Sequence, residues 1–190
     1  MKNNILKTGL ILVLATSIAS FSTISEKKVK VKESNITWKG HKVTGSHEGT
    51  INLSEGVLIF EGDQLAGGHF TIDMTTINVT DLEAGSGKEK LEGHLKSDDF
   101  FGVNNHKKAT FHITNVKGEN SAYKVSGDLT IKGKTNPVVL DMVIDENTAS
   151  AKFKVDRTKF DIRYGSASFF DNLKDKAIYD EFDLNVNLTF

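Results

Sequence analysis

The chain of 190 residues is long enough for one domain with a substantial core, and no Pro/Gly/Ser-rich linker divides it. Its net charge is −1 and no segment is strongly basic, which argues against nucleic acid as a partner. The absence of cysteine excludes disulfides, thiolate metal ligands, a cysteine nucleophile and a lipid attached to an N-terminal cysteine.

The N-terminal segment has the features of an export signal. Lys2 and Lys7 are followed by an apolar stretch from about Leu10 to Ala19 and by small residues up to Ser22. The apolar stretch is too short to span a membrane, so we predict a secretory signal peptide over residues 1–22 and one folded domain over residues 23–190. An N-terminal anchor is the alternative. Export without disulfides suits a bacterial periplasm or the extracellular medium.

Apolar residues at every second position are the recurring signal in the rest of the chain. They occur at 36–38, 49–53, 58–60, 70–74, 109–113, 123–131, 138–144, 151–155 and 178–190. This alternation predicts roughly eight or nine strands, each with one apolar and one polar face. The last segment, "FDLNVNLTF" (182–190), shows the pattern most clearly.

Short turn signals separate these segments and indicate antiparallel neighbours. They are "SEG" (54–56), "KGEN" (117–120), "KGKTNP" (132–137) and "DENT" (145–148). The single proline, Pro137, is predicted to open a strand, where its missing N–H does least harm.

One segment departs from the alternation and predicts a helical insertion. In "GSGKEKLEGHLKSDDFFG" (85–102), Ser86 and Glu89 have the spacing of a capping box, and Ser97 is placed to cap a second short turn. The segment 169–179 is a second candidate, as a helix or as a loop. The fold class is therefore all-β with a short helical insertion.

Many antiparallel strands around one apolar core form a sandwich or a barrel, and a barrel of about eight strands can hold one slender ligand. A barrel that spans a bilayer needs belts of Trp and Tyr, whereas this chain has one Trp and three Tyr against twelve Phe. This composition favours apolar side chains that point into a dry interior. Phe190 resembles the last residue of many outer-membrane barrels. A small outer-membrane β-barrel with a structural or pore role is therefore the alternative.

Three segments carry a family resemblance: "LEGHLKSDDFFGVNNHKKATFHITNV" (91–116), "YKVSGDLTIKGKTNPVVLDM" (123–142) and "DRTKFDIRYGS" (156–166). Together with "GGHFTIDMTTINVTDL" (67–82), they resemble the YceI-like family of exported bacterial proteins over roughly residues 30–190. The resemblance implies an eight-stranded antiparallel lipocalin-like barrel, with a helix near one end and an elongated pocket that binds polyisoprenoid or similar long-chain lipids.

Two segments depart from the family pattern or mark a branch of it. Many members have a proline before the "ATF" strand, but this chain has "NNHKKATF" (104–111), so its local turn can differ. The segment 164–182 marks a particular branch, whose ligand need not be the one known for other members.

Inward-facing apolar residues form the candidate ligand-binding site, with Leu95, Phe100 and Phe101 near a lid. The alternative for each residue is ordinary core packing, so the hypothesis concerns the whole set. The other predicted ligand-binding residues are Trp38, Phe60, Phe70, Ile72, Met74, Phe111, Ile113, Val125, Leu129, Leu140, Met142, Phe153, Phe182, Leu184 and Val186.

The two arginines, Arg157 and Arg163, stand out against twenty-two lysines. A planar guanidinium suits phosphate or carboxylate, so both are candidates for holding a polar lipid head group. The alternative is an ion pair with Asp156, Asp161 or Asp171.

The six histidines do not have the spacing of a metal site, so no metal ligand or other cofactor is assigned. His112 is expected to face solvent. His94 with Asp98 or Asp99 raises the alternative of an exported hydrolase, but a structural role is favoured and no G-x-S-x-G motif is present. No catalytic residue is assigned.

The favoured hypothesis is a periplasmic or secreted protein, not an enzyme, that holds a polyisoprenoid or fatty lipid in its barrel for transport or storage. A homodimer and a transient contact with a membrane remain open as further partners.

Overall fold

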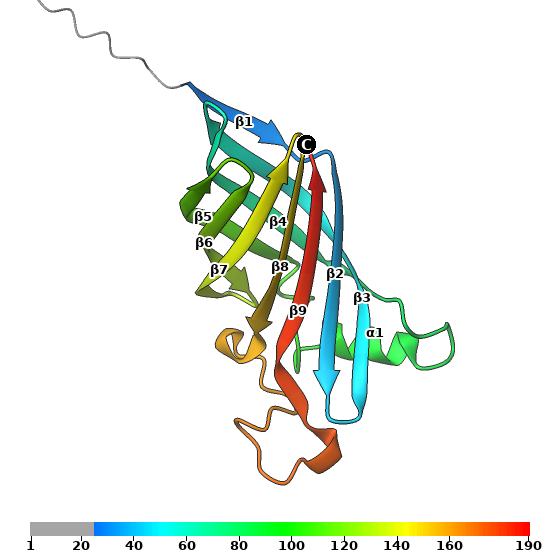
Figure 1. Ribbon diagram of the computed structural model, residues 1–190. Helices are drawn as coiled ribbons and strands as arrows, with labels where there is room; N and C mark the ends of the chain where they lie inside the picture. The colour runs from blue at the N-terminus through cyan, green and yellow to red at the C-terminus, as the bar shows by residue number, and fades with distance from the viewer. Residues whose placement is uncertain (1–24) are drawn as a thin grey trace, which may run out of the picture.

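The computed structural model describes residues 25–190 (Figure 1). The predicted signal peptide, residues 1–22, lies outside this part of the chain. In chain order, the elements of residues 25–190 are β1 (Glu26–Lys30), β2 (Glu33–Lys42), β3 (Gly45–Glu61), β4 (Gln64–Val79), α1 (Lys88–Lys96), β5 (Lys108–Glu119), β6 (Ala122–Ile131), β7 (Lys134–Asp145), β8 (Thr148–Asp156), the 3₁₀ turns η1 (Arg157–Phe160) and η2 (Lys174–Lys176), and β9 (Ile178–Thr189).

Strands β2 to β9 form a closed antiparallel barrel. The strand order is β3-β2-β9-β8-β7-β6-β5-β4, and β4 pairs back onto β3 to complete the ring. Strand β1 pairs with the second half of β3, from Val57 to Glu61. The eight-stranded antiparallel barrel with one short helix that the sequence predicted is therefore confirmed.

Three of the predicted turns connect adjacent strands. The β5–β6, β6–β7 and β7–β8 hairpins turn at Asn120, at Lys132 and Gly133, and at Glu146, all with positive φ angles between 49° and 72°. Asn and Gly tolerate this left-handed backbone, which allows a tight reversal between strands. Their positions agree with the turn signals read from the sequence.

The "SEG" segment at 54–56 was wrongly predicted as a turn. It lies inside β3, a strand of 17 residues, where the pairing with β4 shifts by one residue between Leu53 and Glu55. A shift of this kind is a bulge that bends a long strand around a barrel. Pro137 was predicted to open a strand, but β7 begins three residues earlier, at Lys134.

The helical insertion is confirmed, but the predicted capping box is not. Helix α1 begins after Gly87, whose φ of 101° is left-handed, and no side chain caps its N-terminus. The Glu89 carboxylate accepts from the Gly85 N–H at 3.1 Å instead of from Ser86. Ser97 ends α1, where its hydroxyl donates to the His94 carbonyl at 2.7 Å. Segment 169–179 is mostly a loop that contains η2 and the start of β9.

The apolar faces of the strands point into the barrel. In β6, Tyr123, Val125 and Leu129 are buried, whereas Lys124 and Asp128 between them are exposed. The outer wall is therefore polar and charged, which is the reverse of a barrel that spans a bilayer. The outer-membrane alternative does not fit this orientation.

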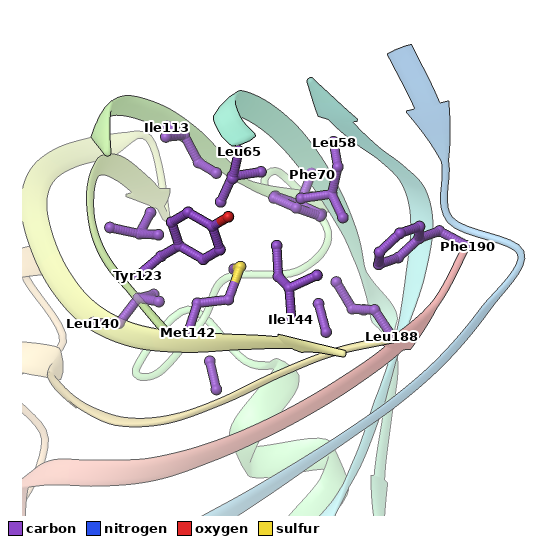
Figure 2. Packing of buried hydrophobic residues seen from close by; sticks show 13 residues of the cluster. Leu58, Leu65, Phe70, Ile113, Tyr123, Leu140, Met142, Ile144, Leu188 and Phe190 are labelled. Atoms are coloured by element: carbon purple, nitrogen blue, oxygen red, sulfur yellow. The ribbon is translucent and has the colours of Figure 1, made fainter. Parts of the chain in front are cut away.

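The interior divides into two packed regions. At one end, Leu58, Leu65, Tyr123, Ile144 and Phe190 belong to a cluster that fills the barrel, here called the closed end (Figure 2). At the other end, here called the mouth, Leu95 and Phe100 of the α1 region pack with Phe160 and Ile162 near η1. The two ends therefore differ in what covers them: strands and their own side chains at one, a helix and loops at the other.

Strands β7 and β8 separate toward the mouth. They pair only between Met142–Asp145 and Thr148–Ala151, and the rest of β7 has no partner on that side. Turn η1 lies at this gap, where Asn136 Nδ2 donates to the Lys159 carbonyl at 2.8 Å. Phe160 and Ile162 are fully buried there, and Arg157, at the start of η1, lines the barrel cavity.

Candidate functional site

An apolar cavity of about 190 Å³ occupies the barrel between the closed end and the mouth. Every wall strand from β2 to β9 contributes to it, and Leu95, Phe100 and Phe101 cover it from the α1 side. Among residues 25–190, Arg157 is the only charged residue in its lining. A space of this kind suits an apolar guest, because nothing in its wall except that one group carries a charge.

Most of the predicted ligand-binding residues lie together around this cavity. Those in its lining are Trp38, Phe70, Ile72, Met74, Leu95, Phe100, Phe101, Phe111, Leu129, Leu140, Met142, Phe153, Phe182, Leu184 and Val186. Phe60, Ile113 and Val125 are not in the lining; they belong to or pack against the closed-end cluster. They point inward as expected, but the barrel is filled at their level.

The sequence analysis missed several residues of the cavity wall. They are Ile36, Gly40, Ile51, Leu53, Ile77, Ala109, Ile131, Ala151, Ile178, Tyr179 and Leu188. Most lie two residues from a residue that was chosen, so the same alternation would have found them. Gly40, Ala109 and Ala151 were passed over because they are small, yet small inward residues are what leave the barrel partly empty.

Two aromatic rings lie against glycines of the neighbouring strand. A Cβ at Gly49 would lie 2.6 Å from the Trp38 ring, and a Cβ at Gly127 would lie 2.6 Å from the Phe111 ring. Trp38 Nε1 also donates to the Thr50 carbonyl at 3.2 Å, which fixes its indole. The rings therefore lie along the wall and leave the middle of the barrel open.

The Arg157 side chain is 2% exposed and its donors are used by the protein. Its Nε donates to the Tyr179 carbonyl at 3.1 Å, Nη1 to Ile162 at 2.8 Å and Nη2 to Ile178 at 3.0 Å. Nη2 also lies 3.6 Å from Asp180 Oδ1. Arg157 thus joins η1 to the start of β9, and most of its hydrogen-bonding capacity is not free for a ligand.

Arg163 lies elsewhere. It is not in the cavity lining, and its Nε is 2.9 Å from Asp161 Oδ1, with both side chains 54% exposed. Its guanidinium also stands over the Phe169 ring, 4.6 Å from the centroid. The two arginines do not converge on one site. The ion pair of Arg163 with Asp161 is among the pairs predicted from the sequence. Arg157 instead lies beside Asp180, which was not among the predicted partners.

The carboxyl of Asp180 has a lowered pKa. Burial would raise the pKa of Asp180, but hydrogen bonds from Ser166 and Ser168 and the charge of Arg157 outweigh it. A carboxylate with a lowered folded-state pKa stabilises the fold above its unfolded pKa of about 3.9, and this contribution is lost as the pH falls through the folded-state value.

We therefore expect acid to destabilise the mouth through Asp180. Thermal unfolding followed from neutral pH to below about pH 4 should show a steeper loss of stability in the wild type than in Asp180→Asn, which has no proton to take up. Equal slopes for the two proteins would mean that Asp180 is not responsible.

His69 of β4 is paired with His112 of β5 across the two strands, and three other histidines have partners of different kinds. His41 Nε2 lies 2.6 Å from Asp183 and His47 Nδ1 lies 2.8 Å from Asp81, while the His94 ring packs edge-on against Tyr164 at 4.4 Å. His112 is exposed, as expected. Within residues 25–190, no three His, Cys, Asp or Glu side chains are grouped so that they could hold a metal ion. The same residues contain no helix that is long and apolar enough to cross a membrane.

The closed antiparallel ring and its apolar cavity place the protein among small β-barrels that enclose an internal pocket. The model of the YceI-like domain matches residues 28–190, so the chain belongs to the YceI-like family. The resemblance found in the sequence is thereby confirmed.

Curated relatives match over shorter segments. Protein YceI of Shigella flexneri is 31% identical over 93 residues, which cover 49% of this chain and 46% of that protein. A UPF0312 protein of Pectobacterium atrosepticum is 32% identical over 93 residues, which cover 49% of this chain and 46% of that protein. These matches thus span about half the length of the curated relatives.

Solved structures share the fold at low sequence identity. BcnA of Burkholderia cenocepacia is 20% identical, with a TM-score of 0.65 over 83% of this chain and 96% of that one. A polyisoprenoid-binding domain from Saccharophagus degradans, implicated in plant cell wall breakdown, is 13% identical. Its TM-score is 0.55, and the match covers 84% of this chain and 95% of that domain's chain. At these identities the likeness establishes the fold alone.

Proposed function

We propose that this protein binds a long-chain apolar lipid, of polyisoprenoid or similar type, inside its barrel and carries or stores it without chemical turnover. The observation that supports this most is the cavity between the closed end and the mouth, whose lining contains one charged residue that is already hydrogen-bonded to the protein. The polyisoprenoid-binding domain from Saccharophagus degradans, which shares the fold, is consistent with the same ligand class.

The dimensions of the cavity favour a slender guest. Along β9 the lining extends from Ile178 to Leu188. Ten residue steps at about 3.3 Å correspond to about 33 Å of strand, or roughly 25 Å along the axis of a barrel whose strands tilt by about 40°. Each buried CH₂ contributes about 0.8 kcal/mol, so a chain of this length needs no ionic contact to be held.

The same site favours a ligand with an uncharged head group, or one whose head remains in water at the mouth. A buried phosphate or carboxylate is costly unless it gains a cation with free donors. Arg157 donates to three carbonyls and lies beside Asp180, and Arg163 is outside the cavity. Binding by a shared arginine pair is therefore not part of the proposal.

The location proposed for this activity is the periplasm or the extracellular medium, after removal of residues 1–22. The apolar segment near the N-terminus supports it. A carrier outside the cytoplasm would give a water-insoluble lipid a dry environment between membranes or between cells.

Organic extraction of the purified protein, followed by mass spectrometry, tests the proposal. We expect a long-chain lipid in about one copy per protein molecule, and in the emptied protein we expect uptake of a long-chain fluorescent probe. A neutral prenol should displace this probe at least as well as a phosphorylated prenol of equal length. If no lipid is extracted and no probe enters, the proposed function is wrong.

A further inference from the structure

Large apolar side chains are exposed at the mouth of the barrel. Val43, Tyr164, Phe169, Phe170 and Tyr179, here called the mouth patch, are between 45% and 56% exposed. They make up five of the seven large apolar residues that are exposed within residues 25–190; the other two, Val139 and Val143, lie on the outer wall of β7. Exposure of this kind is concentrated at one end, and such concentrations commonly mark interaction sites.

The parts of the mouth patch are held together by contacts around the entrance. The Val43 N–H donates to the Ala177 carbonyl at 3.2 Å and joins the β2–β3 turn to loop 161–177. Tyr164 packs against His94 of α1, with 4.4 Å between ring centroids. Figure 1 shows loop 161–177 and the β2–β3 turn together at the lower end of the barrel, away from the C-terminus.

The mouth patch is continuous with the cavity. Tyr179 is 56% exposed and also belongs to the cavity lining, next to Ile178. Tyr179 therefore links the apolar interior of the barrel to its exposed surface at the mouth.

The charge balance of loop 161–177 favours an uncharged surface as the partner. Loop 161–177 contains three cations and three carboxylates, namely Arg163, Lys174 and Lys176 with Asp161, Asp171 and Asp175. Arg163 is paired with Asp161 and covers the ring of Phe169. Loop 161–177 therefore has no excess positive charge for a polyanion, whereas exposed Phe and Tyr are suited to the boundary between lipid head groups and acyl chains.

We infer that the protein docks on a lipid bilayer through the mouth patch, and that its ligand passes between bilayer and cavity at this contact. The inference rests on the proposed function, because a water-insoluble chain must be drawn from a lipid phase. Beyond that function, the inference specifies the docking surface and how it contacts the bilayer. Phe169 and Phe170 enter the boundary of the acyl chains, and Tyr164 and Tyr179 lie at the head groups.

Vesicle binding with matched variants tests the inference. The chain has no cysteine, so Phe170→Cys and Val143→Cys can each carry one environment-sensitive dye. With vesicles of phosphatidylcholine alone we expect a blue shift of the dye at position 170 and none at position 143. Added phosphatidylglycerol or salt should change binding little. Phe169→Ser with Phe170→Ser should lower vesicle binding roughly tenfold, while Val139→Ser with Val143→Ser should not.

The outcomes separate this inference from the function on which it rests. If wild-type protein takes up the apolar probe in vesicle-free buffer but binds no vesicles, the docking inference is wrong and the proposed function stands. Equal shifts at positions 170 and 143 would mean general adsorption and would also overturn the inference. If the probe does not enter the protein at all, both proposals fail.

Discussion

Replacement of Gly40 by tryptophan is expected to weaken ligand binding about a hundredfold and to leave the barrel folded. Gly40 lies in the cavity lining on β2, opposite Phe182 of β9, and a Cβ at this position has no atom within 4 Å. An indole there would displace about four CH₂ groups of the ligand from the cavity. Their lost burial corresponds to about 3 kcal/mol of binding free energy, which lowers affinity roughly a hundredfold.

The stability of the same variant is the control for this effect. Glycine weakens a strand, so a larger side chain that meets open space should hold or raise the thermal midpoint. Gly40→Ala occupies little of the cavity and should bind the probe nearly as well as the wild type. Full binding by a folded Gly40→Trp protein would place the ligand somewhere other than this cavity.

Replacement of Arg157 by methionine is expected to destabilise the protein by about 3 kcal/mol. The change leaves the carbonyls of Ile162, Ile178 and Tyr179 without their donors and leaves Asp180 without its cation. Buried acceptors without partners each cost about 1 kcal/mol or more. In a domain of this size the thermal midpoint should fall by about 6–12 °C.

Arg163 provides the matched control, since it is an arginine of the same region whose ion pair is half-exposed. Arg163→Met should change stability by less than about 0.5 kcal/mol. An Arg157→Met protein as stable as the wild type, with lower affinity only for phosphorylated ligands, would instead identify Arg157 as a head-group residue.

The fold was largely predictable because its dominant signal is local. Alternation such as that of Tyr123, Val125 and Leu129 indicates a strand and its inward face without knowledge of its partners. The hairpin turns at 120 and 132–133 are also local, since Asn120 and Gly133 accept a left-handed backbone.

The errors arose where tertiary structure determines the role of a local motif. "SEG" reads as a turn, but closure of the barrel requires β3 to continue through it with a bulge. Ser86 and Glu89 have capping-box spacing, but the left-handed Gly87 sets the start of α1. Phe60, Ile113 and Val125 alternate like the cavity residues, and only the packing at the closed end separates them.

The environment of Arg157 could not be read from the sequence for a similar reason. The carbonyls of Ile178 and Tyr179 follow it by more than twenty residues, and they reach it only because β7 and β8 separate and η1 occupies the gap. A rare arginine indicated a geometric role, but not that its partners are backbone carbonyls.

The two methionines of the cavity offer the most direct test of a ligand held inside the barrel. Met74 packs in the mouth-side cluster and Met142 in the closed-end cluster, and both belong to the cavity lining. In protein labelled with ¹³C at the methionine methyl groups, addition of a long-chain prenol should move both resonances, since one chain passes both depths. If the prenol binds and neither resonance moves, the ligand lies outside the barrel and the account is wrong.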